Sequence, residues 1–208
     1  MTLALTVIAV FALLVGFELW WRRRRAHGEF SRKFIHLVVG SFVAFWPWYL
    51  DWHWIVALSA AFVVVVSLSK QLGIFRAIHA VERPTWGELF FALAVGVLAF
   101  VTHDPYIYAA ALLHMSLADG FAAVVGVAFG KRNQYTVFGH PKSIAGSATF
   151  FGISLLILAW YKAASGSTIG IGTILTLSAV TTAIENAGVK GLDNLLVPLL
   201  IGVVLINL

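Results

Sequence analysis

Eight apolar segments set the strongest limit on how this chain can fold. Short polar turns separate them, and they lie at about 2–21, 34–50, 53–69, 87–102, 105–128, 145–161, 168–185 and 194–208. A run of about 20 apolar residues crosses the hydrocarbon core of a bilayer as a helix. Of the 208 residues only 11% are charged, whereas about a quarter are charged in a typical soluble domain. The sequence therefore predicts an all-α fold, a polytopic integral membrane helical bundle with about eight spanning or near-spanning helices.

The basic residues are unevenly distributed between the turns of this predicted bundle. All but one of the 14 Lys and Arg residues fall in every second turn, and Lys162 is the exception. Cytoplasmic loops of membrane proteins carry such an excess of positive charge. We therefore expect the basic side to be cytoplasmic, both termini to face outward, and the basic excess to reflect topology rather than nucleic-acid binding. The turns at 46–54 and 103–108, on the other side, carry the aromatic residues expected at a membrane interface.

The domain organisation follows from the absence of any polar insert. The chain has no soluble segment of domain size and no internal repeat, so we predict a single membrane domain over 1–208. Within it, residues 1–31 would form an N-terminal anchor helix and a basic loop, and 32–208 the helical bundle that carries the site. The sequence contains no cysteine, which excludes disulfide and thiolate chemistry.

Four polar clusters on the predicted cytoplasmic side are not explained by topology alone. The first is SRKFIHLVVG (31–40), in which His36 follows Arg32 by four residues and Lys33 by three. This spacing places the three side chains on one face of a helix where it enters the membrane. Snorkelling of long basic side chains to the interface would explain this cluster equally well.

The second cluster is LADGFAAVVGVAFGK (117–131). Asp119 lies inside an apolar run, where a carboxylate is costly and marks a candidate functional site. Ala122, Gly126 and Gly130 recur every four residues on the same side of the helix, and such a stripe lets another backbone approach closely. The alternative is that Asp119 serves only as a polar staple in helix packing.

The third cluster is GKRNQYTVFGHPKSIAGSATFF (130–151), a basic and hydroxylated turn between two apolar segments. Lys142 offers a point charge, Ser143 a hydroxyl and Gly146 accessible backbone. Ser143 is also a candidate N-cap for the next helix, whose first N–H groups would favour an anion. The stretch lacks the Walker A pattern but suits a phosphate group. The alternative is an ordinary capped helix start with a snorkelling lysine.

The fourth cluster is IENAGVKGLDNLLVP (184–198). Glu185 ends one apolar segment, and Asp193 with Asn194 begins the next. Together with Asp119 these residues place three carboxylates on the same side of the predicted bundle. Carboxylates, waters and substrate phosphates are the usual ligands of Mg²⁺ in proteins. Alternatively, Glu185 and Asp193 only mark helix ends.

In this order, the four clusters resemble the family of CTP-dependent lipid-alcohol kinases, which includes dolichol kinase, phytol kinase and CTP-dependent diacylglycerol kinase. That family is related to the phosphatidate cytidylyltransferases. RKFIH resembles the R-K-x-x-H motif of the family, and ADGFAAVVGVAFGK resembles its G-D-x-x-A-x-x-x-G-x-x-x-G segment. KSIAGSATFF resembles the K-[ST]-x-x-G-[ST] block, and LDNLLVP resembles the D-N-x-x-x-P block. GELFFALAV (87–95) is a further similar segment. The chain departs from the pattern at Ala118, Ala123 and Ala145, where members carry Gly, often a second acid, and in some cases Glu. The KSIAGS form is nearest to the phytol kinase branch.

The resemblance implies transfer of the γ-phosphate of CTP, with Mg²⁺ as cofactor, to the hydroxyl of a long-chain isoprenoid or related lipid alcohol at the cytoplasmic interface. The implied partners are the lipid alcohol, the nucleoside triphosphate and membrane lipids. Candidate catalytic residues are His36, Asp119, Lys142 and Asp193, and candidate metal ligands are Asp119, Glu185 and Asp193. Candidate nucleotide-binding residues are Arg32, Lys33, Gly126, Gly130, Lys131, Arg132, Lys142, Ser143, Gly146 and Asn194.

Three other functions are compatible with parts of the sequence. A cytidylyltransferase would attach CMP to a lipid phosphate and release pyrophosphate, whereas a kinase would release CDP. A transporter would use Asp119 in an ion or substrate path, although an internal repeat would then be usual. A membrane scaffold without activity would tolerate neutral replacement of all three carboxylates.

Overall fold

The computed structural model describes residues 2–24, 28–72 and 86–208 of the chain. Within these ranges the regular structure is helical apart from one short β-hairpin. The α-helices are α1 (Thr2–Arg24), α2 (Gly28–Ala44), α3 (Trp52–Leu72), α5 (Gly87–Val101), α6 (Pro105–Leu113), α7 (Asp119–Phe129), α8 (Ile144–Ser165), α9 (Ile171–Ala187) and α10 (Asp193–Ile206). The hairpin strands are β1 (Gln134–Val137) and β2 (His140–Ser143), and the short turns are η1 (Trp46–Trp48), the π-helical η2 (His114–Ala118) and η3 (Gly130–Arg132).

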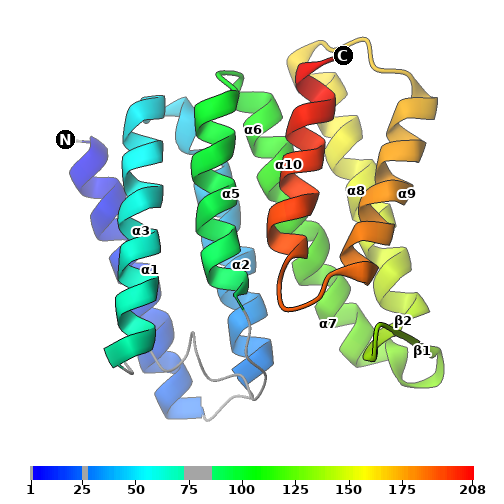
Figure 1. The fold of residues 1–208 in the computed structure, drawn as a ribbon, viewed down its shortest axis with the longest axis horizontal. Helices are drawn as coiled ribbons and strands as arrows, with labels where there is room; N and C mark the ends of the chain where they lie inside the picture. The colour runs from blue at the N-terminus through cyan, green and yellow to red at the C-terminus, as the bar shows by residue number, and fades with distance from the viewer. Residues whose placement is uncertain (1, 25–27, 73–85) are drawn as a thin grey trace.

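The predicted helical segments agree closely with the observed helices. Each apolar segment contains one helix, and the segment 105–128 contains α6, η2 and α7 as one continuous helical run. Consecutive helices run in opposite directions, so that α1 begins and α10 ends at the same end of the molecule (Figure 1). The hairpin and the turn between α9 and α10 lie at the opposite end (Figure 1). The predicted turn at 70–86 falls largely outside the described residues.

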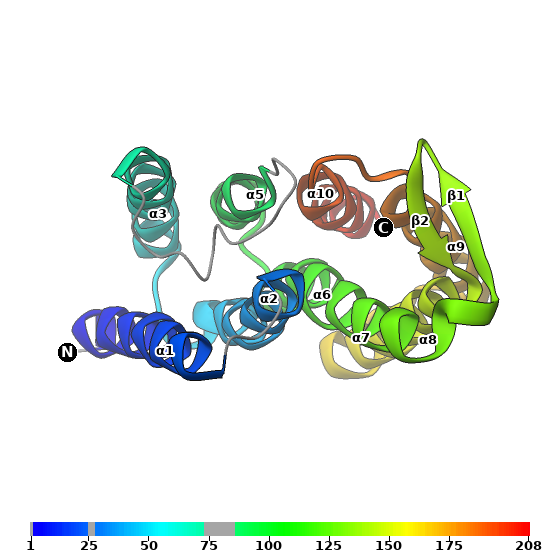
Figure 2. The ribbon, with the colours of Figure 1, turned by 90° about the horizontal axis from the view of Figure 1, so that it is seen from below.

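The helices form two layers. Figure 2 shows α3, α5, α10 and α9 in one layer, and α1, α2, the α6–α7 run and α8 in the other. Fully buried residues of α6, such as Tyr108 and Leu112, place this helix in the core, where it packs against α2, α8 and α10. The sequence favours this central position because α6 is apolar all round.

Local sequence signals explain where individual helices begin. The Asp104 carboxylate accepts hydrogen bonds from the backbone N–H groups of Tyr106 (2.7 Å) and Ile107 (3.1 Å), just before α6. Ser143 accepts a hydrogen bond from the backbone N–H of Gly146 at 3.0 Å, which confirms the predicted N-cap of α8. A side-chain cap satisfies N–H groups that a helix start leaves without partners.

The stripe of small residues on α7 allows the close approach that the sequence predicts. A Cβ atom added at Gly146 of α8 would lie 3.1 Å from the carbonyl oxygen of Ala122 and 3.5 Å from Cα of Gly126. A Cβ atom at Gly130 would lie 2.6 Å from Ser143. The backbones of α7 and α8 therefore meet where the hairpin begins and ends.

Helix length and composition support a membrane location for part of the bundle. Among the described residues, two helices are long and apolar enough to cross a membrane, Pro105–Arg132 and Ile144–Ser165. Other apolar helices are shorter, and the 14 residues of α10 extend over only about 21 Å at about 1.5 Å per residue. The hydrocarbon core of a bilayer is about 30 Å thick. The fold is thus the predicted helical one, while the number of spans and the side that each end faces stay predictions.

Candidate active site

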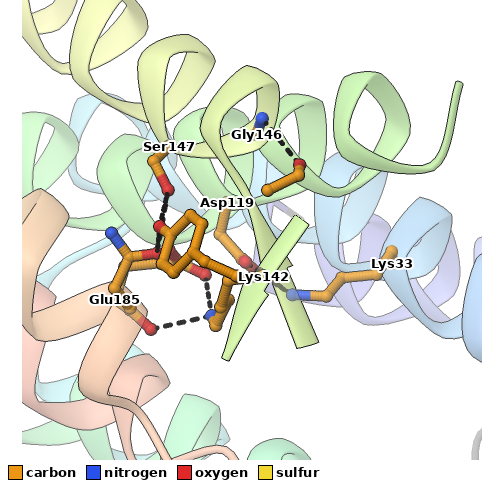
Figure 3. Close-up of polar contacts among 9 residues, drawn as sticks. Lys33, Asp119, Lys142, Gly146, Ser147 and Glu185 are labelled. Atoms are coloured by element: carbon orange, nitrogen blue, oxygen red, sulfur yellow. Dashed lines mark hydrogen bonds and ion pairs between the residues drawn. The ribbon is translucent and has the colours of Figure 1, made fainter. Parts of the chain in front are cut away.

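Charged side chains from four distant parts of the chain meet at the hairpin end of the bundle. Lys33 comes from α2, Asp119 from the start of α7, Lys142 from β2 and Glu185 from the last turn of α9. Figure 3 shows the ammonium group of Lys33 directed at Asp119 and that of Lys142 directed at Glu185. The structure therefore brings together one predicted candidate from each of the four clusters.

Asp119 is buried and forms an ion pair with Lys33. Only 4% of the surface of Asp119 is exposed, and Lys33 donates hydrogen bonds to both of its carboxylate oxygens. Asp119 directly follows the π-helical turn η2, which widens the helix just before the carboxylate. π-Helical turns occur frequently at functional sites. The ion pair joins α2 to α7, and the catalytic role of Asp119 stays a prediction.

Lys142 forms the second ion pair of the site. Its ammonium group donates to Oε1 of Glu185 at 2.5 Å and to the main-chain carbonyl oxygen of the same residue at 2.9 Å. Glu185 is largely buried, with 8% of its surface exposed. These contacts hold β2 against the end of α9, so that the hairpin covers this end of the bundle.

Asp193 lies in the same electrostatic environment, just before the predicted apolar segment 194–208. Burial raises its pKa, and the nearby carboxylate of Asp119 raises it further, while Lys33 and Lys142 act in the opposite direction. A Cβ atom at Gly188 would lie 2.7 Å from Oδ1 of Asp193, so the carboxylate packs on the backbone of the α9–α10 turn. Asp193 thus belongs to the cluster even though it makes neither of the two ion pairs.

His36 lies one helical turn beyond Lys33 and is also buried. Its ring makes an edge-to-face contact with Phe91, with 5.2 Å between the ring centroids. Its charge when protonated would act directly on Asp119, as would that of Lys142. Both side chains therefore lie near Asp119, as expected if Lys33 and His36 share one face of the helix.

The carboxylates of the site meet only part of what a divalent cation requires. Among the described residues, no group of three or more His, Asp or Glu side chains is arranged as a ready cage for a metal ion. Asp119 and Glu185 are instead neutralised by lysines, and Asp193 stands near them. Mg²⁺ usually binds through one or two carboxylates together with waters and substrate phosphates. The three carboxylates thus suit a magnesium ion that arrives with a nucleotide, and their role as metal ligands stays a prediction.

The roles of the remaining candidates in nucleotide binding stay predictions. The Asn194 amide donates to the carbonyl oxygen of Gly87 at 3.1 Å and so joins α10 to α5. Lys131 and Arg132 are exposed on η3 at the base of the hairpin. The glycines Gly126, Gly130 and Gly146 line the close crossing of α7 and α8 described above. The side chain of Arg32 lies outside the described part of the structure.

Sequence reasoning missed a hydrogen-bonded group that holds the hairpin in place. The Tyr135 hydroxyl donates to Oδ1 of Asn186 at 2.9 Å and lies 2.5 Å from Oγ of Ser147, which also donates to Asn186. These residues join β1, α8 and α9 directly beside the contact between Lys142 and Glu185. Alternation of Tyr135 and Val137 with polar residues was the available signal for a strand.

Sequence reasoning also gave Glu88 no role. This residue in the first turn of α5 is only 5% exposed, and neither carboxylate oxygen has a hydrogen-bond partner among the described residues. Its neighbour Gly87 is the residue that accepts the hydrogen bond from Asn194. A charged residue at the start of a strongly apolar helix was the signal in this case.

Comparison with known proteins places the chain in a family. It is 34% identical over 197 residues to a phytol kinase of Synechocystis, and the match covers 90% of this chain and 83% of that protein. It is 27% identical to a probable chloroplastic phytol kinase of Triticum aestivum, over 94% of this chain and 72% of that protein. No protein-family model matches the chain, and no solved structure matches it. Because the similarity extends over so much of both chains, this protein belongs to the family of lipid-alcohol kinases that includes the phytol kinases.

Proposed function

We propose that this protein transfers the γ-phosphate of CTP to the hydroxyl group of a long-chain isoprenoid alcohol. The observation that carries the proposal is the meeting of Lys33, Asp119, Lys142 and Glu185 at one end of an apolar bundle. Phosphoryl transfer depends on positioning and on neutralising charge more than on covalent chemistry. A cluster that combines two lysines with three carboxylates supplies both kinds of group.

The two lysines would exchange their partners when the nucleotide binds. Lys33 and Lys142 each neutralise a largely buried carboxylate in this structure. Triphosphate oxygens would attract the same ammonium groups, and Asp119 with Asp193 and Glu185 would then be free to bind the magnesium ion. That ion would neutralise the charge that develops on the phosphates during transfer. Lys131 and Arg132, both exposed at the base of the hairpin, would attract the nucleotide from solution.

The start of α8 would contribute a second contact to the phosphates. Ser143 caps this helix, whose first N–H groups carry partial positive charge. The hairpin delivers Lys142 one residue before this cap, so that the ammonium group and the helix start act on the same region. This combination resembles the helix N-termini that bind phosphate in many unrelated proteins.

The lipid would remain among the helices while its hydroxyl reaches the charged cluster. The outer surface carries large exposed apolar side chains, including Phe100, Leu156 and Ile171, which would face lipid. The excess of basic residues in the turns at the hairpin end supports a cytoplasmic location for the reaction. His36 or one of the carboxylates would accept the proton of the attacking hydroxyl, since these groups lie beside Asp119.

The proposal is tested by incubating the purified protein, reconstituted in lipid, with Mg²⁺ and one of several nucleotides. Phytol, a polyprenol and diacylglycerol serve as acceptors, and mass spectrometry identifies the lipid and nucleotide products. We expect CTP to give CDP and a lipid monophosphate with an isoprenoid acceptor. Release of pyrophosphate with a CMP-containing lipid would indicate a cytidylyltransferase. Failure of every nucleotide and alcohol to react, with folded protein, would contradict the proposal.

A further inference from the structure

The hairpin ends in a turn whose sequence is unfavourable for its backbone. Val137 pairs with His140, which leaves Phe138 and Gly139 as the two residues of the turn. Both have positive φ, 47° for Phe138 and 79° for Gly139. Two-residue turns of this kind strongly favour Asn-Gly, and a bulky residue with positive φ is rare. Phe138 therefore holds a conformation that its side chain disfavours.

Packing within the chain does not explain this phenylalanine. Phe138 is 75% exposed, so its side chain buries little surface against the rest of the molecule. Strained backbone at an exposed position persists when the side chain serves a function. An aromatic ring that is this exposed is suited to a contact outside the molecule.

The surroundings of the hairpin indicate which contact this is. The two candidate membrane spans, Pro105–Arg132 and Ile144–Ser165, are joined by the hairpin. Large apolar side chains are exposed where these spans meet it: Val127 at 73%, Phe129 at 72% and Ile144 at 62%. Apolar side chains at this position would face acyl chains, and the hairpin would then lie at the level of the lipid headgroups.

The charges beside the hairpin match this placement. Lys131 and Arg132 are exposed at its base, immediately after the apolar part of the first candidate span. Basic side chains next to exposed aromatic and aliphatic ones are typical of surfaces that bind membranes with anionic lipids. Figure 2 shows the hairpin lying across the end of the bundle from α7 and α8, past α9, with its tip at the outer edge of the molecule.

We propose that the tip of the hairpin is a membrane-interface contact. The ring of Phe138 inserts at the boundary between headgroups and acyl chains. The positive charge of Lys131 and Arg132 attracts anionic headgroups as well as the nucleotide. The contact holds the strand that carries Lys142 at the membrane surface. The proposal rests on the membrane location proposed above and is independent of which nucleotide or alcohol reacts.

Single-cysteine labelling tests the contact directly, because the natural chain contains no cysteine. Variants Phe138→Cys, Gln134→Cys and Leu156→Cys each carry an environment-sensitive fluorophore, in nanodiscs of phosphatidylcholine and phosphatidylglycerol. Lipids with a nitroxide near the headgroup or deep in the acyl chain act as quenchers, and iodide quenches from water. We expect headgroup nitroxide to quench position 138, deep nitroxide to quench position 156 on the exposed face of α8, and iodide to quench position 134.

The two control positions separate the possible failures. Quenching at position 156 without quenching at 138 would overturn the contact and leave the membrane location intact. Absence of lipid quenching at both positions would contradict the membrane location itself. If CTP shields position 138 from iodide while lipid nitroxides leave it unquenched, the tip covers the nucleotide instead and the proposal is wrong.

A second measurement moves the fluorophore from the turn to the neighbouring strand, so that the turn itself carries no label. A fluorophore at Thr136→Cys, exposed on the same hairpin, is compared with Phe138 present and with Phe138→Asn. Asn-Gly is the pair that this turn favours, so Phe138→Asn should fold at least as well as the natural chain. We expect headgroup quenching at position 136 to fall severalfold in the Asn variant. Equal quenching in both proteins would show that the ring does not hold the tip at the membrane.

Discussion

At the scale of single residues, the cost of burying charge decides which side chains need a functional explanation. A buried ion pair contributes little net stability, because removing two ions from water offsets most of their attraction. The pairs Lys33–Asp119 and Lys142–Glu185 are nevertheless both largely buried at one end of the bundle. Apolar side chains would stabilise this position at least as well. The two pairs therefore favour the proposed binding of phosphate and metal at this position over a purely stabilising role.

The first prediction concerns Asp119. Asn keeps the size of the side chain but removes the charge that would hold Mg²⁺, so Asp119→Asn should reduce turnover to less than about a tenth of the natural rate, about 1.4 kcal/mol in barrier. Thermal stability should fall, because Asn leaves the Lys33 ammonium group without the charged partner that it has in this structure. The steady-state rate and the unfolding midpoint are measured together.

Asp51→Asn is the matched control, because Asp51 is exposed at the opposite end of the bundle and the same charge is removed there. It should leave the rate unchanged. Partial recovery of Asp119→Asn with high Mg²⁺ or Mn²⁺ would support metal binding. Near-natural turnover by the Asp119→Asn variant would remove Asp119 from the catalytic residues.

The second prediction concerns Lys142. Loss of a charge-assisted contact of about 1.5–3 kcal/mol should weaken use of the nucleotide by roughly ten- to hundredfold in Lys142→Ala. The substitution also leaves Glu185 without the ammonium group that it contacts at 2.5 Å. The double variant Lys142→Ala with Glu185→Gln should therefore recover stability but not activity. Nucleotide saturation curves and thermal unfolding distinguish the two effects.

Lys162→Ala provides the matched lysine control. Lys162 donates to the carbonyl oxygen of Ile169 at 2.6 Å, at the end of the bundle away from the hairpin. The Lys162→Ala substitution should leave nucleotide saturation unchanged. If Lys142→Ala also behaved like the natural protein, Lys142 would serve only to fasten the hairpin to α9.

At the scale of secondary structure elements, the sequence predicted helices well and the hairpin not at all. Long apolar runs between polar turns define helices with little ambiguity. Most observed bounds differ from the predicted ones by four residues or fewer, whereas α2 begins and ends six residues before the predicted segment 34–50. The strands β1 and β2 have only four residues each and lie in a polar stretch. Such a segment has the composition of a loop. Its pairing depends on hydrogen bonds of Tyr135 to Ser147 in α8 and to Asn186 in α9, and Asn186 is distant from the hairpin in sequence.

In the candidate active site, too, the sequence predicted some features and not others. Asp119, Lys142 and Glu185 could be selected because a charge in or beside an apolar segment is unusual. Their partners could not be predicted, because Lys33 and Asp119 are separated by 86 positions and Lys142 and Glu185 by 43. Pairing across such distances depends on how the helices pack, which apolar periodicity does not determine.

The third prediction tests the crossing of α7 and α8. A methyl group in Gly146→Ala would lie 3.1 Å from the carbonyl oxygen of Ala122, so the backbones of α7 and α8 would have to move apart by a few tenths of an ångström. Overpacking of this kind costs about 1–3 kcal/mol, and we expect a lower unfolding midpoint together with lower activity. Gly152→Ala in the same helix is the control, because nothing lies within 4 Å of its added Cβ atom. Equal midpoints for the two variants would show that the crossing is not tight.

At the scale of the whole molecule, the alternation of helix directions follows from the sequence, but the layers do not. An even series of apolar segments with short turns must return to the same end after every second helix, as observed (Figure 1). Nothing in the apolar pattern shows that α10 inserts between α5 and α9 in one layer (Figure 2). That position depends on particular contacts, such as Leu98 packed directly over Gly202 and the hydrogen bond from Asn194 to α5.

The fourth prediction concerns sidedness. In intact cells, a cysteine at position 134 on the hairpin should react with a membrane-impermeant reagent only after permeabilisation, because the basic turns are expected on the cytoplasmic side. A cysteine at Thr168, exposed in the turn between α8 and α9, should react from outside. The reverse pattern would place the charged cluster on the wrong side of the membrane for a cytoplasmic nucleotide.

We propose that the cluster of lysines and carboxylates directs transfer of a terminal phosphate to a lipid hydroxyl. The most direct measurement follows label from CTP into phytol, with the reconstituted protein, Mg²⁺ and either γ-labelled or α-labelled CTP. We predict that γ-label alone enters the lipid, that Asp119→Asn abolishes this transfer, and that Asp51→Asn preserves it. Entry of α-label into the lipid, or undiminished transfer of γ-label by Asp119→Asn, would contradict the account.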